Sequence, residues 1–226
     1  MKKKILILPG ALGTSKTMQP LSDFIKTNFE VYTFDYKPLQ VNLKPGETYV
    51  TKFAKDVLQY LEEKNLNSVI LFGYSFGGLI ALQTAHFDAS KITSIYSYGT
   101  IWKWNKDVAK HMLKFMNPDL IEEKIPHYAK LLKSWFELED WKMLVKEEIK
   151  RTTFLGNNPP FQTTDLAKTT IPVHYRIGDK DNIAIPKFTK WANQHTPNST
   201  FGVIPDSAHP VLQINLDYLK KDLISK

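Results

Sequence analysis

Six short apolar stretches recur along the chain, each continuous rather than alternating and rich in β-branched or aromatic residues. Continuous apolar runs of this length are typical of strands in a parallel sheet that is covered on both faces. Helix-like segments separate them, as expected for a chain that alternates strand and helix. The predicted strands are Lys4–Leu8, Phe29–Asp35, Ser68–Phe72, Ile92–Tyr98, Pro172–Ile177 and Thr200–Ile204.

Amphipathic segments between these runs predict the helices that cover the sheet. In the first of them, Phe53, Val57, Tyr60 and Leu61 recur at the spacing of one helix face. We expect an α/β fold in a single domain over residues 1–226, with a mostly parallel sheet of about six strands. The predicted helices are Tyr49–Lys64, Phe76–Phe87, Pro186–His195 and Val211–Ile224.

The interval 101–168 interrupts this alternation. It contains no convincing strand, but several amphipathic helical pieces that are rich in aromatic residues. An insertion of this length exceeds what one crossover helix needs, and we expect a helical lid over the strand ends. Most of its rings could equally pack a small core of the insertion itself, with a few facing a pocket. The aromatic residues are Trp102, Trp104, Phe115, Tyr128, Trp135, Phe136, Trp141 and Phe154.

Composition narrows the class of protein. With 226 residues, of which 42% are apolar, the chain can bury one core, and no apolar run approaches the length of a membrane span. The basic start followed by Ile5–Leu8 superficially resembles a signal peptide, but Pro9-Gly10 interrupts it at once. The absence of cysteine excludes disulfides and thiolate metal sites. We therefore expect a cytoplasmic protein.

The net charge of +7 raises the question of a nucleic-acid or membrane partner. Only Arg151 and Arg176 are arginine, however, and the lysines are spread along the whole chain. Arginine is the usual reader of phosphates and base edges, and no basic block or nucleic-acid-binding signature is present. The charge predicts a solvated lysine-rich surface, and we expect a small-molecule substrate rather than nucleic acid.

One motif carries candidate chemistry. Gly73-Tyr74-Ser75-Phe76-Gly77 follows a predicted strand directly and precedes a predicted helix. A G-x-S-x-G in this position is typical of the tight turn that presents a nucleophilic serine. The alternative is an ordinary glycine-rich turn between strand and helix.

A serine nucleophile needs a base and a group that orients the base. Of the six histidines, only His209 lies in a loop directly after the last predicted strand, where it can reach the same edge of the sheet as Ser75. The loop after the preceding strand offers Asp179 and Asp181 as orienting acids. The order Ser, Asp, His along the chain fits this chemistry with either acid.

The loop Pro9–Gly13 follows the first predicted strand and could direct a backbone N–H toward Ser75. The same residues could form an ordinary strand-to-helix turn or a fragment of a phosphate loop. They match neither G-x-G-x-x-G nor the G-K-[ST] ending, so nucleotide binding is not expected. We expect no cofactor and no metal.

These motifs together resemble an α/β-hydrolase-fold protein with a helical cap, over essentially the whole chain. The resemblance implies Ser75 as nucleophile, His209 as base and Asp181, rather than Asp179, as acid. It also implies that Ala11 and Phe76 supply the backbone N–H groups of an oxyanion hole. The chain departs from the family where Pro9 replaces the usual loop histidine, and it starts at what corresponds to the family's third strand.

The resemblance implies a serine hydrolase that cleaves a small, largely apolar ester or thioester. Serine at the nucleophile position argues against haloalkane dehalogenases, epoxide hydrolases and dienelactone hydrolases. The same triad also serves C–C bond hydrolases, amidases and acyltransferases, and a non-catalytic ligand-binding relative is a further alternative. The expected pocket residues are Leu12, Tyr74, Trp102, Trp104 and Trp135.

Overall fold

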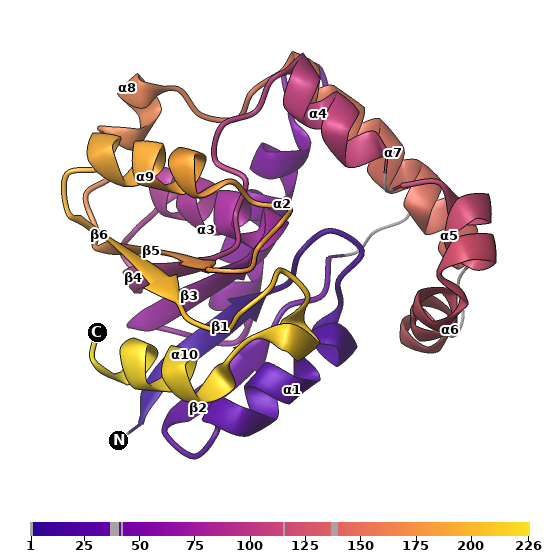
Figure 1. The fold of residues 1–226 in the computed structure, drawn as a ribbon. Helices are drawn as coiled ribbons and strands as arrows, with labels where there is room; N and C mark the ends of the chain where they lie inside the picture. The colour runs from indigo at the N-terminus through magenta and orange to yellow at the C-terminus, as the bar shows by residue number, and fades with distance from the viewer. Residues whose placement is uncertain (1, 37–40, 42, 115, 137–139) are drawn as a thin grey trace. The chain divides into compact units, whose positions relative to one another are not determined.

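A computed structural model gives the arrangement of the chain (Figure 1) and describes residues 2–36, 41, 43–114, 116–136 and 140–226. The chain divides into two compact units. The core unit consists of residues 1–35, 50–103 and 161–226, and the helical unit of residues 36–49 and 104–160. Phe115, one of the aromatic residues of the predicted insertion, lies outside the described residues.

The core unit is built on one six-stranded sheet in which every neighbouring pair of strands is parallel. The strand order is β2-β1-β3-β4-β5-β6. This confirms the predicted parallel sheet of about six strands, and each strand lies within two residues of its predicted bounds. The strands are β1 (Lys3–Leu8), β2 (Phe29–Thr33), β3 (Val69–Tyr74), β4 (Ile92–Tyr98), β5 (Val173–Gly178) and β6 (Ser199–Ile204).

Helices cover both faces of this sheet. Figure 1 shows α1 and α10 on one face and α2, α3 and α9 on the other. Strand β1 is consequently buried on both sides, and Ile5 through Leu8 have no exposed surface. This is why the strands read as continuous apolar runs. The helices of the core unit are α1 (Ser15–Ile25), α2 (Tyr49–Glu63), α3 (Phe76–Phe87), α8 (Thr163–Leu166), α9 (Pro186–His195) and α10 (Leu216–Ile224), with a 3₁₀ turn η1 (Val211–Gln213).

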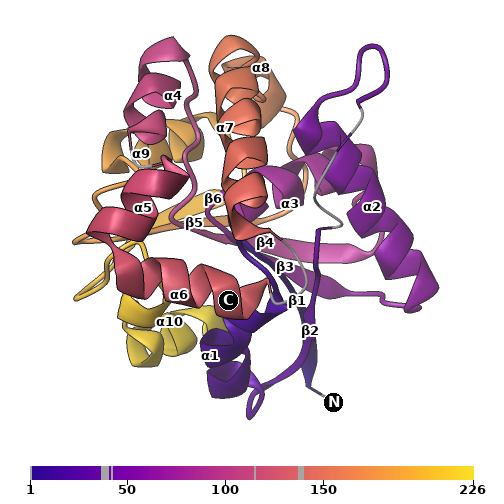
Figure 2. The same cartoon turned by 90° about the vertical axis from the view of Figure 1, so that its right-hand side faces the viewer.

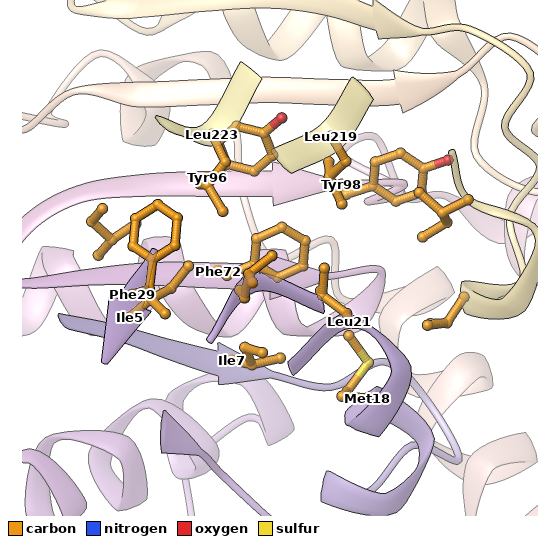
Figure 3. Close-up of a cluster of buried hydrophobic side chains, with 14 of the residues drawn as sticks. Ile5, Ile7, Met18, Leu21, Phe29, Phe72, Tyr96, Tyr98, Leu219 and Leu223 are labelled. Carbon is orange, nitrogen blue, oxygen red and sulfur yellow. The ribbon is translucent and has the colours of Figure 1, made fainter. Parts of the chain in front are cut away.

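One apolar cluster fills the space between the sheet and the helices α1 and α10. Figure 3 shows Tyr96 and Tyr98 of β4 beside Leu219 and Leu223 of α10. The ring of Phe72 on β3 stacks on Tyr96 with ring centroids 5.5 Å apart. These side chains fix the central strands, whose carboxyl ends carry the candidate site.

Two helical predictions need correction. Helix α1 was not expected, and Pro20 inside it weakens its helical pattern in the sequence. The single helix predicted over 211–224 is wrong, because η1 ends before a break at Asn215. The Asn215 side chain accepts a hydrogen bond from the backbone N–H of Tyr218 at 3.1 Å. Asn215 therefore caps a new helix rather than continuing the old one.

The described residues of the helical unit form four helices and no strand. Figures 1 and 2 show α4 and α7 side by side, and a Cβ added at Gly156 would lie only 2.4 Å from the Cβ of Ala109. Trp141, Leu144 and Val145 are buried on α7. The helices are α4 (Lys106–Leu113), α5 (Pro118–Lys124), α6 (Pro126–Trp135) and α7 (Trp141–Asn157).

Candidate active site

Ser75 occupies the sharp turn between β3 and α3, with φ 50° and ψ −117°. This backbone conformation is strained for a residue with a side chain. A Cβ at Gly77 would lie 2.2 Å from the carbonyl oxygen of Leu8, so only glycine fits where the turn passes β1. The backbone N–H of Ser75 donates to the carbonyl of Tyr98 at 2.8 Å, and the Thr100 hydroxyl donates to the carbonyl of Ser75 at 2.8 Å. The strained turn is thus held on both sides by β4 and the loop after it.

The structure brings His209 to this serine. Nε2 of His209 lies 3.2 Å from Oγ of Ser75, although the two residues are 134 positions apart in sequence. His209 is 8% exposed, on the loop that follows β6. A hydrogen bond of this length lets the imidazole accept the hydroxyl proton.

Asp181 is the third residue of this hydrogen-bonded group, after Ser75 and His209. Its Oδ2 lies 2.9 Å from Nδ1 of His209, and its side chain has no exposed surface. Its Oδ1 accepts hydrogen bonds from the backbone N–H groups of Ile183 and Ala184, each at 2.9 Å. The carboxylate is held by its own loop, and its second oxygen faces the imidazole.

Asp179 has a different partner. Its Oδ1 accepts a hydrogen bond at 2.9 Å from the backbone N–H of Ser207, two residues before His209. Hydrogen bonds from the backbone of Ser207, and then of Asp206, lower the pKa of Asp179 below its usual value. Asp179 therefore binds the backbone of the histidine loop, whereas Asp181 contacts the histidine ring.

Gly99, directly after β4, is a site residue for which no role was predicted. Its φ is +64°, and an added Cβ would lie 3.2 Å from both Oδ2 of Asp181 and Nδ1 of His209. A side chain here would need a strained backbone and would crowd the carboxylate–imidazole pair. A glycine directly after a predicted central strand was the sequence signal that could have indicated a position close to the site.

The loop between β1 and α1 passes beside the serine. A Cβ at Gly10 would lie 3.0 Å from the Cβ of Ser75. The N–H of Gly13 donates to the carbonyl of Gly10 at 3.0 Å, and Leu12 has a positive φ of 51°. Ala11 lies within this tight loop, and Phe76 is the first residue of α3. Their role as oxyanion donors stays a prediction.

The five expected pocket residues lie in different surroundings. Leu12 is in the loop just described, and the hydroxyl of Tyr74 donates to the carbonyl of His209 at 2.7 Å. Trp102 has no exposed surface and packs edge-on against Tyr175, with ring centroids 4.9 Å apart. Trp104 and Trp135 belong to the helical unit. The pocket roles of all five stay predictions.

No group of three or more His, Cys, Asp or Glu side chains in the described part of the chain could hold a metal ion. Among the helices of that same part, none is both long enough and apolar enough to cross a membrane.

A parallel sheet with a serine at a strand-to-helix turn, and with an acid and a histidine after later strands, defines the α/β-hydrolase class of proteins. A sequence model of the alpha/beta hydrolase fold matches residues 3–140. The chain belongs to the α/β hydrolase fold family.

Individual proteins agree with this assignment. The chain is 26% identical to the protein named serine hydrolase BPHL of Mus musculus over 223 residues, which cover 91% of this chain and 72% of the mouse protein. The esterase EaEST from Exiguobacterium antarcticum superposes with a TM-score of 0.77 at 16% identity, covering 99% of this chain and 91% of the esterase. The enol-lactonase from Burkholderia xenovorans LB400 superposes with a TM-score of 0.74 at 15% identity, covering 100% of this chain and 91% of the lactonase. Family and curated relative together support hydrolase activity.

Proposed function

We propose that the protein is a serine hydrolase that cleaves a small, largely apolar ester or thioester through an acyl-enzyme intermediate. The observation that carries this proposal is the hydrogen-bonded series Ser75–His209–Asp181, with contacts of 3.2 and 2.9 Å. Serine alone is a weak nucleophile at neutral pH, and such a series is the arrangement that activates it.

In the first half of the reaction, His209 takes the hydroxyl proton as Ser75 attacks the substrate carbonyl. Asp181 keeps the imidazole in the tautomer whose Nε2 is free to accept that proton, and it stabilises the imidazolium that forms. The backbone N–H groups of Ala11 and Phe76 donate to the oxyanion, a contribution typically worth about 10²- to 10³-fold in turnover per donor. His209 then gives the proton to the leaving alcohol or thiol.

In the second half, water attacks the acyl group on Ser75. His209 takes a proton from that water and returns it to the serine oxygen as the acid leaves. The enzyme is regenerated, and one ester and one water yield one acid and one alcohol or thiol.

We further propose that the helical unit is the cap that sets substrate specificity. Its two segments follow β2 and β4 in the chain. The carboxyl ends of parallel strands meet at one edge, and Ser75, Asp181 and His209 follow β3, β5 and β6 at that edge. Both segments of the helical unit thus leave the core unit from the edge that carries the triad.

The test uses a fluorophosphonate probe and p-nitrophenyl esters of increasing acyl length. We expect labelling and turnover in the wild type, loss of both in Ser75→Ala, and retention of both in Ser90→Ala. Ser90 is an exposed serine beyond α3 and serves as the matched control. Absence of Ser75-dependent labelling would contradict the proposal. Amides, C–C substrates and added acceptor alcohols, assayed in parallel, identify the other reactions of the same triad.

A further inference from the structure

Several backbone groups of the loop that carries His209 form hydrogen bonds with the rest of the core unit. The backbone N–H of Ala208 donates to the carbonyl of Gln213 at 3.1 Å. The carbonyl of Ser207 accepts a hydrogen bond from the backbone N–H of Lys180 at 2.9 Å. The next two carbonyls, those of Ala208 and His209, accept from tyrosine hydroxyls. Both tyrosines come from central strands of the sheet rather than from neighbouring loops.

The first of these tyrosines is Tyr74, the last residue of β3. It is joined covalently to Ser75, and its hydroxyl donates to the backbone carbonyl of His209 at 2.7 Å. Its ring also lies against the imidazole, with centroids 5.5 Å apart. One side chain therefore connects the residue next to the nucleophile with the backbone of the base.

The second is Tyr98, the last residue of β4, which makes the same connection by another route. Its backbone carbonyl accepts from the N–H of Ser75 at 2.8 Å, and its hydroxyl donates to the carbonyl of Ala208 at 3.0 Å. The side chain has no exposed surface. Burial, and after it the nearby charge of Asp181, raises the pKa of the Tyr98 phenol, which keeps the hydroxyl protonated as a donor.

The two rings support each other. Tyr74 and Tyr98 stack with centroids 6.4 Å apart and an interplanar angle of 16°. Neither side chain can turn away without losing both the stack and its hydrogen bond. Each is attached to the strained turn at Ser75 at one end and to the histidine loop at the other.

We propose that Tyr74 and Tyr98 are positioning residues that set the distance between His209 and Ser75 by binding the backbone of the histidine loop. The inference rests on the proposed triad chemistry and adds a role for two hydroxyls that do not themselves transfer a proton. It also gives Tyr74 a task other than the pocket lining expected from the sequence.

The variants that test it are Tyr74→Phe and Tyr98→Phe, which remove one hydroxyl each and keep the ring stack. Tyr96→Phe is the matched control. Tyr96 lies two residues before Tyr98 on the same strand and is equally buried, but its hydroxyl donates to Asp222 at 2.6 Å, not to the histidine loop. All three variants lose one partly buried hydroxyl hydrogen bond, and the melting temperature of each shows that it is folded.

We expect kcat for a p-nitrophenyl ester to fall about 10-fold in Tyr74→Phe and in Tyr98→Phe, and up to about 10²-fold in the double variant, because small misplacements of reacting groups have effects of that size. KM should change less than about twofold, because each variant removes only a hydroxyl that is bound to the histidine loop and keeps the ring in place. Tyr96→Phe should keep the wild-type kcat. The proposal is wrong if Tyr74→Phe and Tyr98→Phe lose no more kcat than Tyr96→Phe.

A second readout does not depend on turnover. The proton between Nδ1 of His209 and Asp181 can be followed by its low-field proton NMR resonance in wild type and variants. We expect it to broaden through faster exchange in Tyr74→Phe and Tyr98→Phe and to be unchanged in Tyr96→Phe. An equal resonance in all four proteins overturns the positioning role. If the wild type shows no Ser75-dependent labelling, the proposed hydrolase function fails, while this resonance still decides the role of the tyrosines.

Discussion

The guanidinium of Arg176 on β5 lies against the carboxylate of Asp222 on α10, with Nε 2.5 Å from Oδ2. The Arg176 side chain is only 3% exposed and that of Asp222 19%, so this ion pair is largely withdrawn from water. Tyr96 donates its hydroxyl to the same carboxylate oxygen. These contacts join the C-terminal helix to β4 and β5 of the sheet.

We predict that Asp222→Asn lowers the free energy of unfolding by about 3 kcal/mol, because it leaves the Arg176 charge buried without a counter-charge. Asp217→Asn, an exposed change on the same helix, should alter it by less than about 0.5 kcal/mol. Urea denaturation measures both. Equal stability of the two variants would mean that the Arg176–Asp222 ion pair does not stabilise the packing of α10 on the sheet.

Acid should weaken the fold through His174, which neighbours this ion pair. Burial, and next the charge of Arg176, lowers the pKa of His174 to about 4. The unfolded chain, with an ordinary histidine pKa of about 6.5, therefore binds more protons than the folded chain between about pH 6.5 and 4. Stability consequently falls as the pH falls through that window.

We predict that His174→Gln reduces this loss by about 1 kcal/mol, a value well below the full shift because the side chain is partly exposed to solvent. Urea denaturation at pH 7 and pH 4.5 measures the difference. The change concerns stability alone, and a variant whose pH dependence equals that of the wild type would rule out the histidine.

Asp222 affects the pH dependence of stability at lower pH than His174 does. Burial by itself would raise its pKa, but hydrogen bonds from Arg176 and Tyr96 outweigh burial and lower it below the usual value. Its contribution to stability is therefore present above about pH 4, the ordinary pKa of aspartate, and is lost as the pH falls through the lower folded pKa. The two groups thus act in successive pH windows.

The two acids of one loop should differ sharply in their effect on turnover. We predict that Asp181→Asn lowers kcat by about 10³- to 10⁴-fold, because the amide no longer holds the required histidine tautomer. Asp179→Asn should lower it by less than about 10-fold, since the amide oxygen can still accept from the N–H of Ser207. Steady-state kinetics on one ester compares them. The reverse order would reassign the acid.

Gly99→Ala tests the crowding beside the carboxylate–imidazole pair. We predict a loss of about 1 kcal/mol in stability from the positive φ, together with a fall of at least about 10-fold in kcat. Gly46→Ala is the control, because Gly46 also has a positive φ, of +79°, but an added Cβ meets nothing within 4 Å. It should lose stability alone. Retention of full kcat by Gly99→Ala would show that the site tolerates a methyl group there.

Removing a ring from the proposed cap should alter specificity rather than chemistry. We predict that Trp104→Ala and Trp135→Ala raise KM for long-chain esters by roughly 10-fold, through lost apolar burial, and leave kcat for an acetyl ester unchanged. A series of acyl lengths supplies the measurement. Both variants keeping the wild-type preference along that series would contradict a cap role for these tryptophans.

Local patterns sufficed for the strands, for α3 and α9, and for the turn at Ser75, because apolar runs and glycines at tight positions reflect short-range sterics. The same patterns did not predict α1, because Pro20 interrupts its helical pattern in the sequence. Packing of α1 against the sheet stabilises the helix in spite of the proline. The patterns failed again at Asn215, where a side-chain cap starts a new helix.

By itself the sequence determined the class of fold and the three positions, Ser75, His209 and an acid after β5, at which a triad could form. The motif resemblance already favoured Asp181 over Asp179, and the tertiary structure shows the geometry: Asp181 faces the imidazole while Asp179 binds the backbone of Ser207. The tertiary structure alone brought the hydroxyls of Tyr74 and Tyr98 to the histidine loop. The reason is physical: these contacts join residues 28 to 135 positions apart, and their geometry depends on how strands and loops pack rather than on any local preference.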